Sequence, residues 1–192
     1  MARSLDQILL IDLESTCWAD SPPPGQISEI IEIGLCVVEL SSLVRVEKRS
    51  ILVKPVESEI SDFCTSLTTL QPEMFLDAGS LSDAVKCLKK DYRSTDRLWA
   101  SWGDYDRRQF ERVCKRQKVG YPFGPSHLNV KSLFAMAIGS DHEFGLDSAC
   151  EQLGFELEGT HHRGDDDAWN IARVLCHLLR TMRDGEQERA PS

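Results

Sequence analysis

The sequence predicts an α/β fold in which a mixed five-stranded central sheet is flanked by helices. Three runs rich in Ile, Leu and Val follow one another between residues 8 and 54, which predicts three neighbouring strands before the first long helix. Beyond residue 80, strand-like and helix-like segments alternate, and the last of them is amphipathic. This order of elements is typical of a mixed sheet with helices packed on it.

The first three strands are predicted from apolar runs and turn residues. Residues 8–14 form a nearly unbroken Ile/Leu run, which is typical of a strand buried on both faces. The segment 15–26 contains three consecutive prolines and a glycine, so it is predicted to be a loop. Residues 29–40 and 45–54 are predicted strands, and the short connection between them indicates antiparallel pairing.

The second half of the chain is predicted from helix signals and further apolar runs. Ser80 and Asp83 resemble a capping box that begins a helix ending near residue 93. The later elements are a strand at 97–102, a helix carrying Phe110, Val113 and Cys114, a short strand at 129–133, a short helix at 145–153 and a final helix at 165–182. A chain of 192 residues can bury one full core, so we expect a single domain at 1–184 and a flexible tail at 185–192.

The composition argues against several classes of protein. With 41% hydrophobic and 28% charged residues, the chain fits neither a disordered nor a membrane protein. No apolar stretch is long enough to cross a bilayer, and no signal-peptide core precedes the first strand. Seven cysteines without CxxC spacing indicate reduced thiols rather than a disulfide framework or a zinc site. We therefore expect an intracellular, cytoplasmic protein with no membrane partner.

The formal net charge of −9 argues at first against a nucleic-acid partner, because phosphate binding normally leaves a basic footprint. Divalent cations held by carboxylates would make the local field positive whatever the remote surface carries, so the total charge does not decide the question. A basic cluster does occur, and its interpretation is open between a nucleic-acid contact and the solvated face of a helix. Its members are Arg107, Arg108, Arg112, Lys115, Arg116 and Lys118.

Asp12 and Glu14 lie two residues apart within the first predicted strand. Residues i and i+2 of a strand point to the same side, so both carboxylates would project together from a buried segment. Clusters of carboxylate oxygens suit hard divalent cations such as magnesium or manganese. The alternative interpretation makes one acid a helix cap or a salt-bridge partner.

The phase of the final helix selects one acid from the cluster Asp165, Asp166 and Asp167. With Ile171 at zero and 100° per residue, Asp167 falls at about −40°, beside the apolar stripe. Asp166 falls at about 220°, on the predicted solvent side, and Asp165 is better placed as a cap. We therefore expect Asp167 to point into the protein.

The same construction applies to the helix that follows the fourth strand. With Phe110 at zero, Asp106 falls near −40° and Asp104 near 120°, so Asp106 is the inward acid. Asp106 and the selected acid of the final helix each lie in the first turn, where the helix dipole favours a carboxylate.

Three motifs together resemble those of a known family: Asp12-Leu13-Glu14, Ser101-Trp102-Gly103-Asp104-Tyr105-Asp106 and His162-Arg163-Gly164-Asp165-Asp166-Asp167. The chain resembles the DEDDh (DnaQ-like) family of 3′-to-5′ exonucleases, which has a ribonuclease H-like fold, from residue 8 to about residue 179. Residues 14–18 and 61–68 most resemble the branch of the histone-mRNA exonuclease and the enhanced-RNA-interference exoribonucleases. One departure is Thr69, where related sequences often have Gly.

The resemblance implies roles for individual residues. Asp12, Glu14, Asp106 and Asp167 would hold two Mg²⁺ ions, with Mn²⁺ as a possible substitute. His162 would take the proton of the attacking water, since an imidazole titrates near neutral pH. His161 is expected to be an exposed loop histidine. The implied substrate-binding residues are Glu14, Ser15, Thr16, Cys17, Trp18, Thr68, Tyr105 and His162, with Tyr105 or Trp18 stacking on the terminal base.

The implied partner is a single-stranded RNA 3′ end, from which 5′-monophosphate nucleotides would be released. Two alternatives remain open. The chain could be a DNA 3′-to-5′ exonuclease with the same chemistry, or a catalytically silent RNA-binding protein on the same fold. Nothing in the sequence indicates the oligomeric state or the natural RNA.

Overall fold

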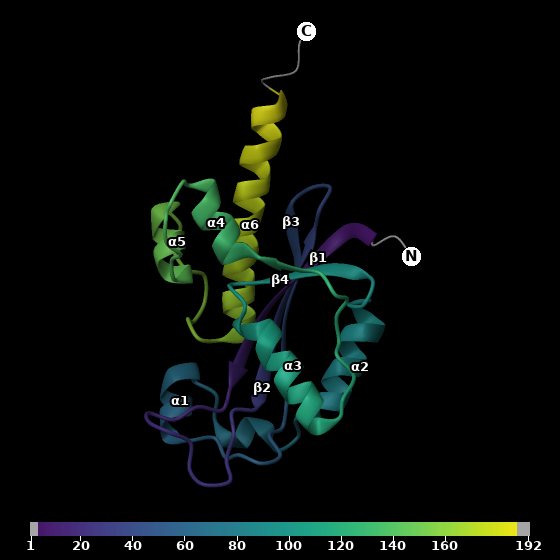
Figure 1. Cartoon of the computed structure of the whole chain (residues 1–192), viewed down its shortest axis with the longest axis vertical. Coiled ribbons are helices and arrows are strands. Elements are labelled where there is room, and N and C mark those ends of the chain that lie inside the picture. Colours follow the sequence, from purple (N-terminus) through teal and green to yellow (C-terminus); the bar gives the residue numbers. More distant parts are fainter. Residues whose placement is uncertain (1–3, 188–192) are drawn as a thin grey trace.

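A mixed five-stranded sheet forms the centre of the computed structural model, which describes residues 4–187 (Figure 1). The strands lie in the order β3-β2-β1-β4-β5. Strand β1 pairs antiparallel with β2 and parallel with β4, β2 pairs antiparallel with β3, and β4 pairs parallel with β5. Their bounds are β1 Ser4–Ser15, β2 Ile30–Glu39, β3 Val44–Leu52, β4 Arg97–Ser101 and β5 His127–Asn129. The predicted fold class is confirmed.

Helices cover both faces of the sheet. They are α1 (Asp62–Thr68), the 3₁₀ helix η1 (Pro72–Phe75), α2 (Leu81–Asp91), α3 (Tyr105–Gln117), α4 (Val130–Ala137), α5 (Leu146–Gln152) and α6 (Gly164–Gln187). Ile8 and Leu10 face a core shared with α4, α5 and α6, whereas Leu9 and Ile11 face a core shared with α2 and α3. The first strand is therefore buried on both faces, as predicted. No helix in residues 4–187 is long and apolar enough to cross a membrane.

A close backbone contact brings the start of α6 onto the sheet. A Cβ atom on Gly34 of β2 would lie only 1.8 Å from the carbonyl carbon of Gly164, so the approach requires glycine at position 34. A Cβ on Gly164 would in turn lie 3.0 Å from the backbone oxygen of Asp12. The first turn of α6, including Asp167, is thereby placed beside the end of β1.

Local signals explain where two of the helices begin and end. Ser80 and Asp83 form the predicted capping box of α2, with each side chain bonded to the other residue's backbone N–H. Helix α1, which the sequence did not predict, begins at the cap Ser61 and ends at Thr69. Thr69 has φ 63°, a left-handed conformation that favours glycine, which explains why related sequences often carry Gly there.

Three boundaries differ from the predictions. The fifth strand is His127–Asn129 rather than residues 129–133, because the Asn129 side chain accepts a hydrogen bond from the Ser132 N–H (3.0 Å) and caps α4. A segment as short as residues 129–133 cannot be assigned to strand or helix by periodicity alone. Helix α6 continues to Gln187, so residues 185–187 are helical and not part of a tail. Residues 188–192 lie outside the described part of the chain.

Candidate active site

Four acids from three elements meet at the carboxyl end of β1. Oxygen atoms of Asp12, Glu14 and Asp167 all lie within 4.8 Å of one another. Asp106, from the first turn of α3, is held against β1 because its Oδ1 accepts a hydrogen bond from the Leu13 N–H (2.9 Å). The structure thus brings together the four acids that the sequence singled out.

The first-turn acids are the ones that the helical phase selected. Asp106 is 3% exposed and Asp167 is 4% exposed, whereas Asp104, Asp165 and Asp166 are only partly buried. Asp104 stands at the cap position of α3 without bonding its backbone. The inward orientation predicted for Asp106 and Asp167 is confirmed by this burial.

Burial and neighbouring acids raise the pKa values of the two β1 acids. Burial raises the pKa of Asp12 well above its usual range, and the charges of Asp106, Glu14 and Asp167 raise it further. Burial, followed by the charges of Asp167, Glu32 and Asp106, raises the pKa of Glu14 to about 9. The pKa of Asp106 is raised to about 7 by burial, although its hydrogen bonds act in the opposite direction. The site therefore concentrates negative charge that the protein solvates poorly.

The two β1 acids lack an ion-pair partner among the described residues. Within residues 4–187, neither Asp12 nor Glu14 forms an ion pair or a side-chain hydrogen bond. Isolated buried carboxylates are costly, and oxygen donors that converge without a cation are the ligand set preferred by Mg²⁺ and Mn²⁺. The residues present therefore fit a divalent metal site.

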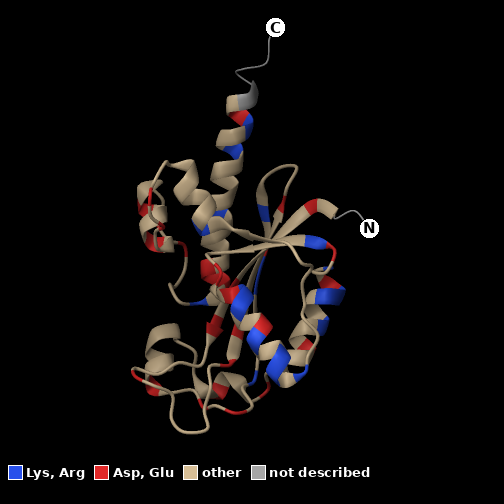
Figure 2. Cartoon of the chain, viewed as in Figure 1, with Lys and Arg blue, Asp and Glu red and all other residues tan. Residues whose placement is uncertain are grey.

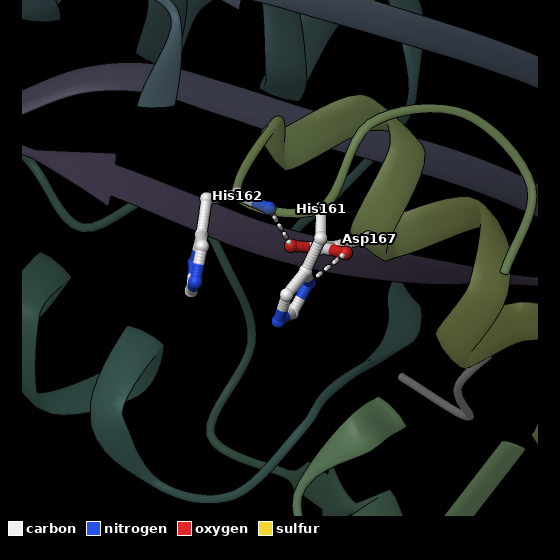
Figure 3. Close-up of side chains that lie close together, drawn as sticks. All are labelled: His161, His162 and Asp167. Carbon is white, nitrogen blue, oxygen red and sulfur yellow. Dashed lines mark hydrogen bonds and ion pairs between the residues drawn. The ribbon is translucent and has the colours of Figure 1, made fainter. Parts of the chain in front are cut away.

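Two histidines stand beside Asp167 (Figure 3). The backbone N–H of His162 donates to Oδ2 of Asp167 (2.9 Å), and Nδ1 of His161 lies 3.0 Å from Oδ1. The two imidazole rings stack with centroids 4.0 Å apart. The ring of His162 forms no hydrogen bond with any described residue, and burial followed by the neighbouring His161 lowers its pKa. His162 therefore presents a neutral imidazole.

His161 is an exposed loop histidine, as predicted, but its side chain makes a contact that the prediction did not include. Its side chain is 41% exposed, yet it contacts Asp167 directly. The loop before α6 turns at His162, whose φ is 64°. Because of this turn, the side chain of His161 lies beside Asp167 in the first turn of the helix. The sequence offered one indication of this contact, because His161 is the neighbour of His162 in the family motif.

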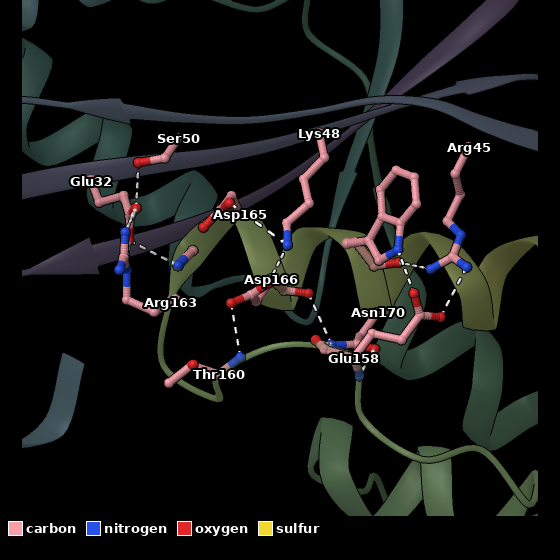
Figure 4. Close-up of polar contacts among 12 residues, drawn as sticks. Glu32, Arg45, Lys48, Ser50, Glu158, Thr160, Arg163, Asp165, Asp166 and Asn170 are labelled. Atoms are coloured by element: carbon pink, nitrogen blue, oxygen red, sulfur yellow. Dashed lines mark hydrogen bonds and ion pairs between the residues drawn. The ribbon is translucent and has the colours of Figure 1, made fainter. Parts of the chain in front are cut away.

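A second set of polar contacts fixes the loop that precedes α6 (Figure 4). The buried carboxylate of Glu32 accepts hydrogen bonds from Arg163 (3.1 Å) and from the Gly164 N–H (2.9 Å). Asp166 accepts from the Thr160 N–H (2.8 Å) and forms an ion pair with Lys48. Asp166 was predicted on the solvent side of α6, and that prediction is wrong because strand β3 supplies Lys48 beside it.

Asp165 was predicted to be a cap. The structure places it inside the first turn of α6, with its carboxylate 3.7 Å from the Lys48 Nζ. That prediction is wrong because the helix begins at Gly164, one residue earlier than expected. The loop and the first turn of α6 are consequently anchored to both β2 and β3.

The predicted substrate-binding residues fall into two groups. Tyr105 is 54% exposed and next to Asp106, while Cys17 and Trp18 are half-buried just beyond β1. The hydroxyls of Thr16 and Thr68 are instead used within the chain: Thr16 bonds Ile27 and Glu29, and Thr68 donates to the carbonyl of Cys64. Both threonine side chains are buried, so the structure does not present them to a ligand.

Ser15 is connected to α3 through a buried glutamine. Nε2 of Gln109 donates to the Ser15 Oγ (3.0 Å) and lies 3.2 Å from the Ser28 Oγ. Gln109 is 2% exposed, and the sequence did not single it out. Its position three residues after Asp106 places both side chains on one face of α3. This spacing could have identified Gln109 as a residue near the site.

Comparisons with known proteins agree with this geometry. The RNase_T family model, described as exonuclease, matches residues 9–175. Human 3′-5′ exoribonuclease 1 is 26% identical over 185 residues, covering 91% of this chain and 52% of that protein, so the chain spans about half of its length.

Solved structures show the same likeness. The nuclease domain of 3′hExo, a DEDDh family member bound to rAMP, has a TM-score of 0.84 at 25% identity and covers 92% of each chain. A 3′-exonuclease described in 3′-end specific recognition of the histone mRNA stem-loop has a TM-score of 0.82 at 25% identity, covering 94% of this chain and 65% of that one. By the match of the family model to most of its length, and by these DEDDh neighbours, the chain belongs to the RNase_T exonuclease family.

Proposed function

We propose that this protein is a metal-dependent 3′-to-5′ exoribonuclease that hydrolyses the last phosphodiester bond of an RNA strand with a free 3′ end. The observation that carries the proposal is the convergence of Asp12, Glu14 and Asp167 within 4.8 Å without a cation of the protein, with Asp106 held beside them. The RNA specificity is supported by the relatives, which are named as exoribonucleases.

The four acids would hold two Mg²⁺ ions, and Mn²⁺ is the expected substitute. The bound cations supply positive charge that stabilises the phosphate group under attack. His162 takes the proton from the attacking water on an imidazole nitrogen, for which its lowered pKa leaves it unprotonated near pH 7. The water oxygen bonds to phosphorus as the bond to the preceding 3′ oxygen breaks. The products are a nucleoside 5′-monophosphate and a strand shortened by one nucleotide, with a new 3′-hydroxyl.

Binding of the terminal nucleotide is assigned to the end of β1 and the start of α3. The backbone at Ser15, Thr16 and Cys17 would meet the 3′-hydroxyl, and Tyr105 or Trp18 would stack on the base. A stacked base contributes about 1–3 kcal/mol and tolerates any sequence. Tyr105 has the larger exposed surface, which favours it over the half-buried Trp18. A cytoplasmic location stays a prediction.

The test is digestion of a 5′-labelled RNA in Mg²⁺, with a DNA strand of the same sequence and a 3′-phosphorylated RNA beside it. We expect progressive shortening from the 3′ end, release of nucleoside 5′-monophosphates, and no reaction in EDTA. The 3′-phosphorylated strand should resist if the free 3′-hydroxyl is recognised. Faster digestion of DNA than of RNA would support the DNA exonuclease alternative. Retention of RNA with no mononucleotide product would support a silent RNA-binding protein.

A further inference from the structure

A groove of about 600 Å³ lies along the first half of α3, facing the end of β5 and the first turn of α4, and its lining includes Tyr105, the residue before Asp106. It is lined by the exposed Tyr105, by Arg108 and Arg112 of α3, and by Lys131 of α4. Helix α3 carries the basic cluster that the sequence left open between a nucleic-acid contact and a solvated helix face. Figure 2 shows these cations along α3, close to the acids at the end of β1.

The cations of α3 differ in how far the protein neutralises them. Arg116 forms an ion pair with Glu57, and Arg107 pairs with Glu111 at 3.2 Å. Arg108 is 73% exposed and reaches an acid only at 3.9 Å. Among the described residues, Arg112 forms no ion pair; its guanidinium donates to the neutral side chain of Gln109. The two arginines that line the groove are therefore less neutralised than Arg107 and Arg116. Lys115, which forms no ion pair among the described residues, does not line the groove.

Two acids also line the groove, and each has a cation of its own. Asp104 lies 3.4 Å from Arg107, and Glu143 lies 3.9 Å from Lys131. The lining as a whole carries three cations (Arg108, Arg112 and Lys131) and two acids (Asp104 and Glu143), so one positive charge is in excess at the groove. On a chain with a net charge of −9, such a local positive surface favours an anionic ligand at this place.

Residues at the inner end of the groove are joined to the active site. Gln109 lines the groove and donates through Nε2 to the Oγ of Ser15, the residue after Glu14. Its other amide atom, Oε1, accepts the hydrogen bond from Arg112. Tyr105, next to Asp106, marks where the groove meets the acids. A strand whose 3′ end reaches the acids would therefore enter the groove with its next nucleotides.

On the basis of the proposed exonuclease function, we infer that this groove binds the sugar-phosphate backbone of single-stranded RNA on the 5′ side of the bond that is cut. Arg108 and Arg112 contact successive phosphates, since guanidinium groups pair well with phosphate oxygens. Backbone contacts of this kind hold a strand without reading its sequence. The enzyme would thus engage several nucleotides while it removes one.

The experiment compares the double variant Arg108→Gln/Arg112→Gln with the control Arg116→Gln, which removes a paired cation from the same helix. Binding of a 5′-fluorescein-labelled twelve-residue oligouridylate is followed by fluorescence anisotropy in EDTA, where no strand is cut, at several salt concentrations. Loss of two phosphate contacts reduces the magnitude of the negative slope of log K against log salt by about 1.4. We expect the double variant to bind at least tenfold more weakly with this reduced slope, and Arg116→Gln to bind within about twofold of wild type.

Cleavage in Mg²⁺ supplies a second readout. The ratio of kcat/KM for the twelve-mer to kcat/KM for a diuridylate should fall at least fivefold in the double variant, because a dinucleotide has no phosphate beyond the bond that is cut. If the double variant melts at a lower temperature than wild type, the single variant Arg108→Gln, whose side chain is highly exposed, is measured instead.

If the double variant has the same affinity and the same salt slope as Arg116→Gln, the groove assignment is overturned, even if the enzyme is an active exonuclease. Because binding is read without metal and without turnover, a protein that binds RNA in this groove but does not cut it would instead refute the proposed function. The two proposals therefore fail on different measurements.

Discussion

Two sets of largely buried acids in this protein differ in whether the described residues provide them with partners. Glu29 and Glu32 are fully buried. Glu29 accepts hydrogen bonds from three backbone N–H groups at 2.8–3.0 Å. Glu32 accepts from Arg163 and the Gly164 N–H. Asp12 and Glu14 lie on the neighbouring strand β1, with Glu14 directly opposite Glu32, and have no such donor within residues 4–187.

The difference shows which carboxylates serve the fold and which await a ligand. A buried charge must be hydrogen-bonded or paired, or else it takes up a proton. The chain meets this requirement for Glu29 and Glu32 and leaves it unmet for Asp12 and Glu14, whose pKa values are raised instead. The unmet pair stands where Asp106 and Asp167 add further negative charge. Burial alone would not have separated the two sets.

The largest effect is expected from the unpartnered set. Asp106→Asn should lower the nuclease rate by a factor on the order of 10²–10³, as for loss of one charge-stabilising group in other active sites. Asparagine keeps the volume and can still accept from the Leu13 N–H, so the circular dichroism spectrum should match wild type. Mononucleotide release by the purified variant is the measurement. A rate near that of wild type in a folded variant would remove Asp106 from the site.

The two sets should respond in opposite directions when an acid is removed. Glu32→Ala leaves Arg163 without its partner and should lower the free energy of unfolding by about 1.5–3 kcal/mol. At about pH 9 in EDTA, where the raised pKa of about 9 leaves Glu14 partly ionised, Glu14→Gln removes one of several repelling charges and should leave stability unchanged or higher. Urea denaturation of both variants against wild type measures this. Equal destabilisation by both substitutions would show that the difference in partners has no energetic meaning.

The same contrast predicts a pH dependence. Acids with raised pKa values bind more protons in the folded than in the unfolded chain, so the fold loses stability as these protons leave. With pKa values of about 7 for Asp106 and about 9 for Glu14, the melting temperature in EDTA should fall as the pH rises from about 6 to about 9. Added Mg²⁺ should reduce this fall, because cations replace the lost protons. A melting temperature in EDTA that is constant or rises over this range would contradict the assignment.

The smallest effect concerns Asp167, the acid of the site that contacts a histidine side chain. His161→Asn removes a partner from Asp167 while the bond from the His162 N–H remains. We expect the rate to change by less than about tenfold, equivalent to about 1.4 kcal/mol in the barrier. His162→Asn is the comparison and should lower the rate by about 10²–10⁴. If His161→Asn had the larger effect, the two histidines would exchange their assigned roles.

Much of the fold was predictable because local pattern and tertiary structure agree. The Ile/Leu run of β1 is buried on both faces, and the helical phase identified Asp106 and Asp167 as the inward acids. Helix α1 was missed because its sequence, Asp-Phe-Cys-Thr-Ser-Leu-Thr, consists largely of weak helix formers. Its cap Ser61 and the burial of Cys64 stabilise it, and the latter depends on tertiary packing.

The acids that the chain itself neutralises were not predictable from their neighbours. Glu32 lies in an apolar strand like Asp12, and its partner Arg163 is 131 residues away in sequence. Only the three-dimensional structure shows that Glu32 of β2 is bonded to a guanidinium and a backbone N–H. Among the described residues, Asp12 and Glu14 of β1 have neither partner. The contact of His161 with Asp167 was missed for a related reason, since it depends on how the loop turns before α6.

The most direct test of the unpartnered set is a titration of the metal-free protein with Mn²⁺, in which free Mn²⁺ is followed by electron paramagnetic resonance. The account predicts saturable binding by the wild-type protein, retained in Glu32→Gln and lost or strongly weakened in Asp12→Asn. An Asp12→Asn variant that binds Mn²⁺ as wild type does, or a folded wild-type protein that binds none, would contradict it.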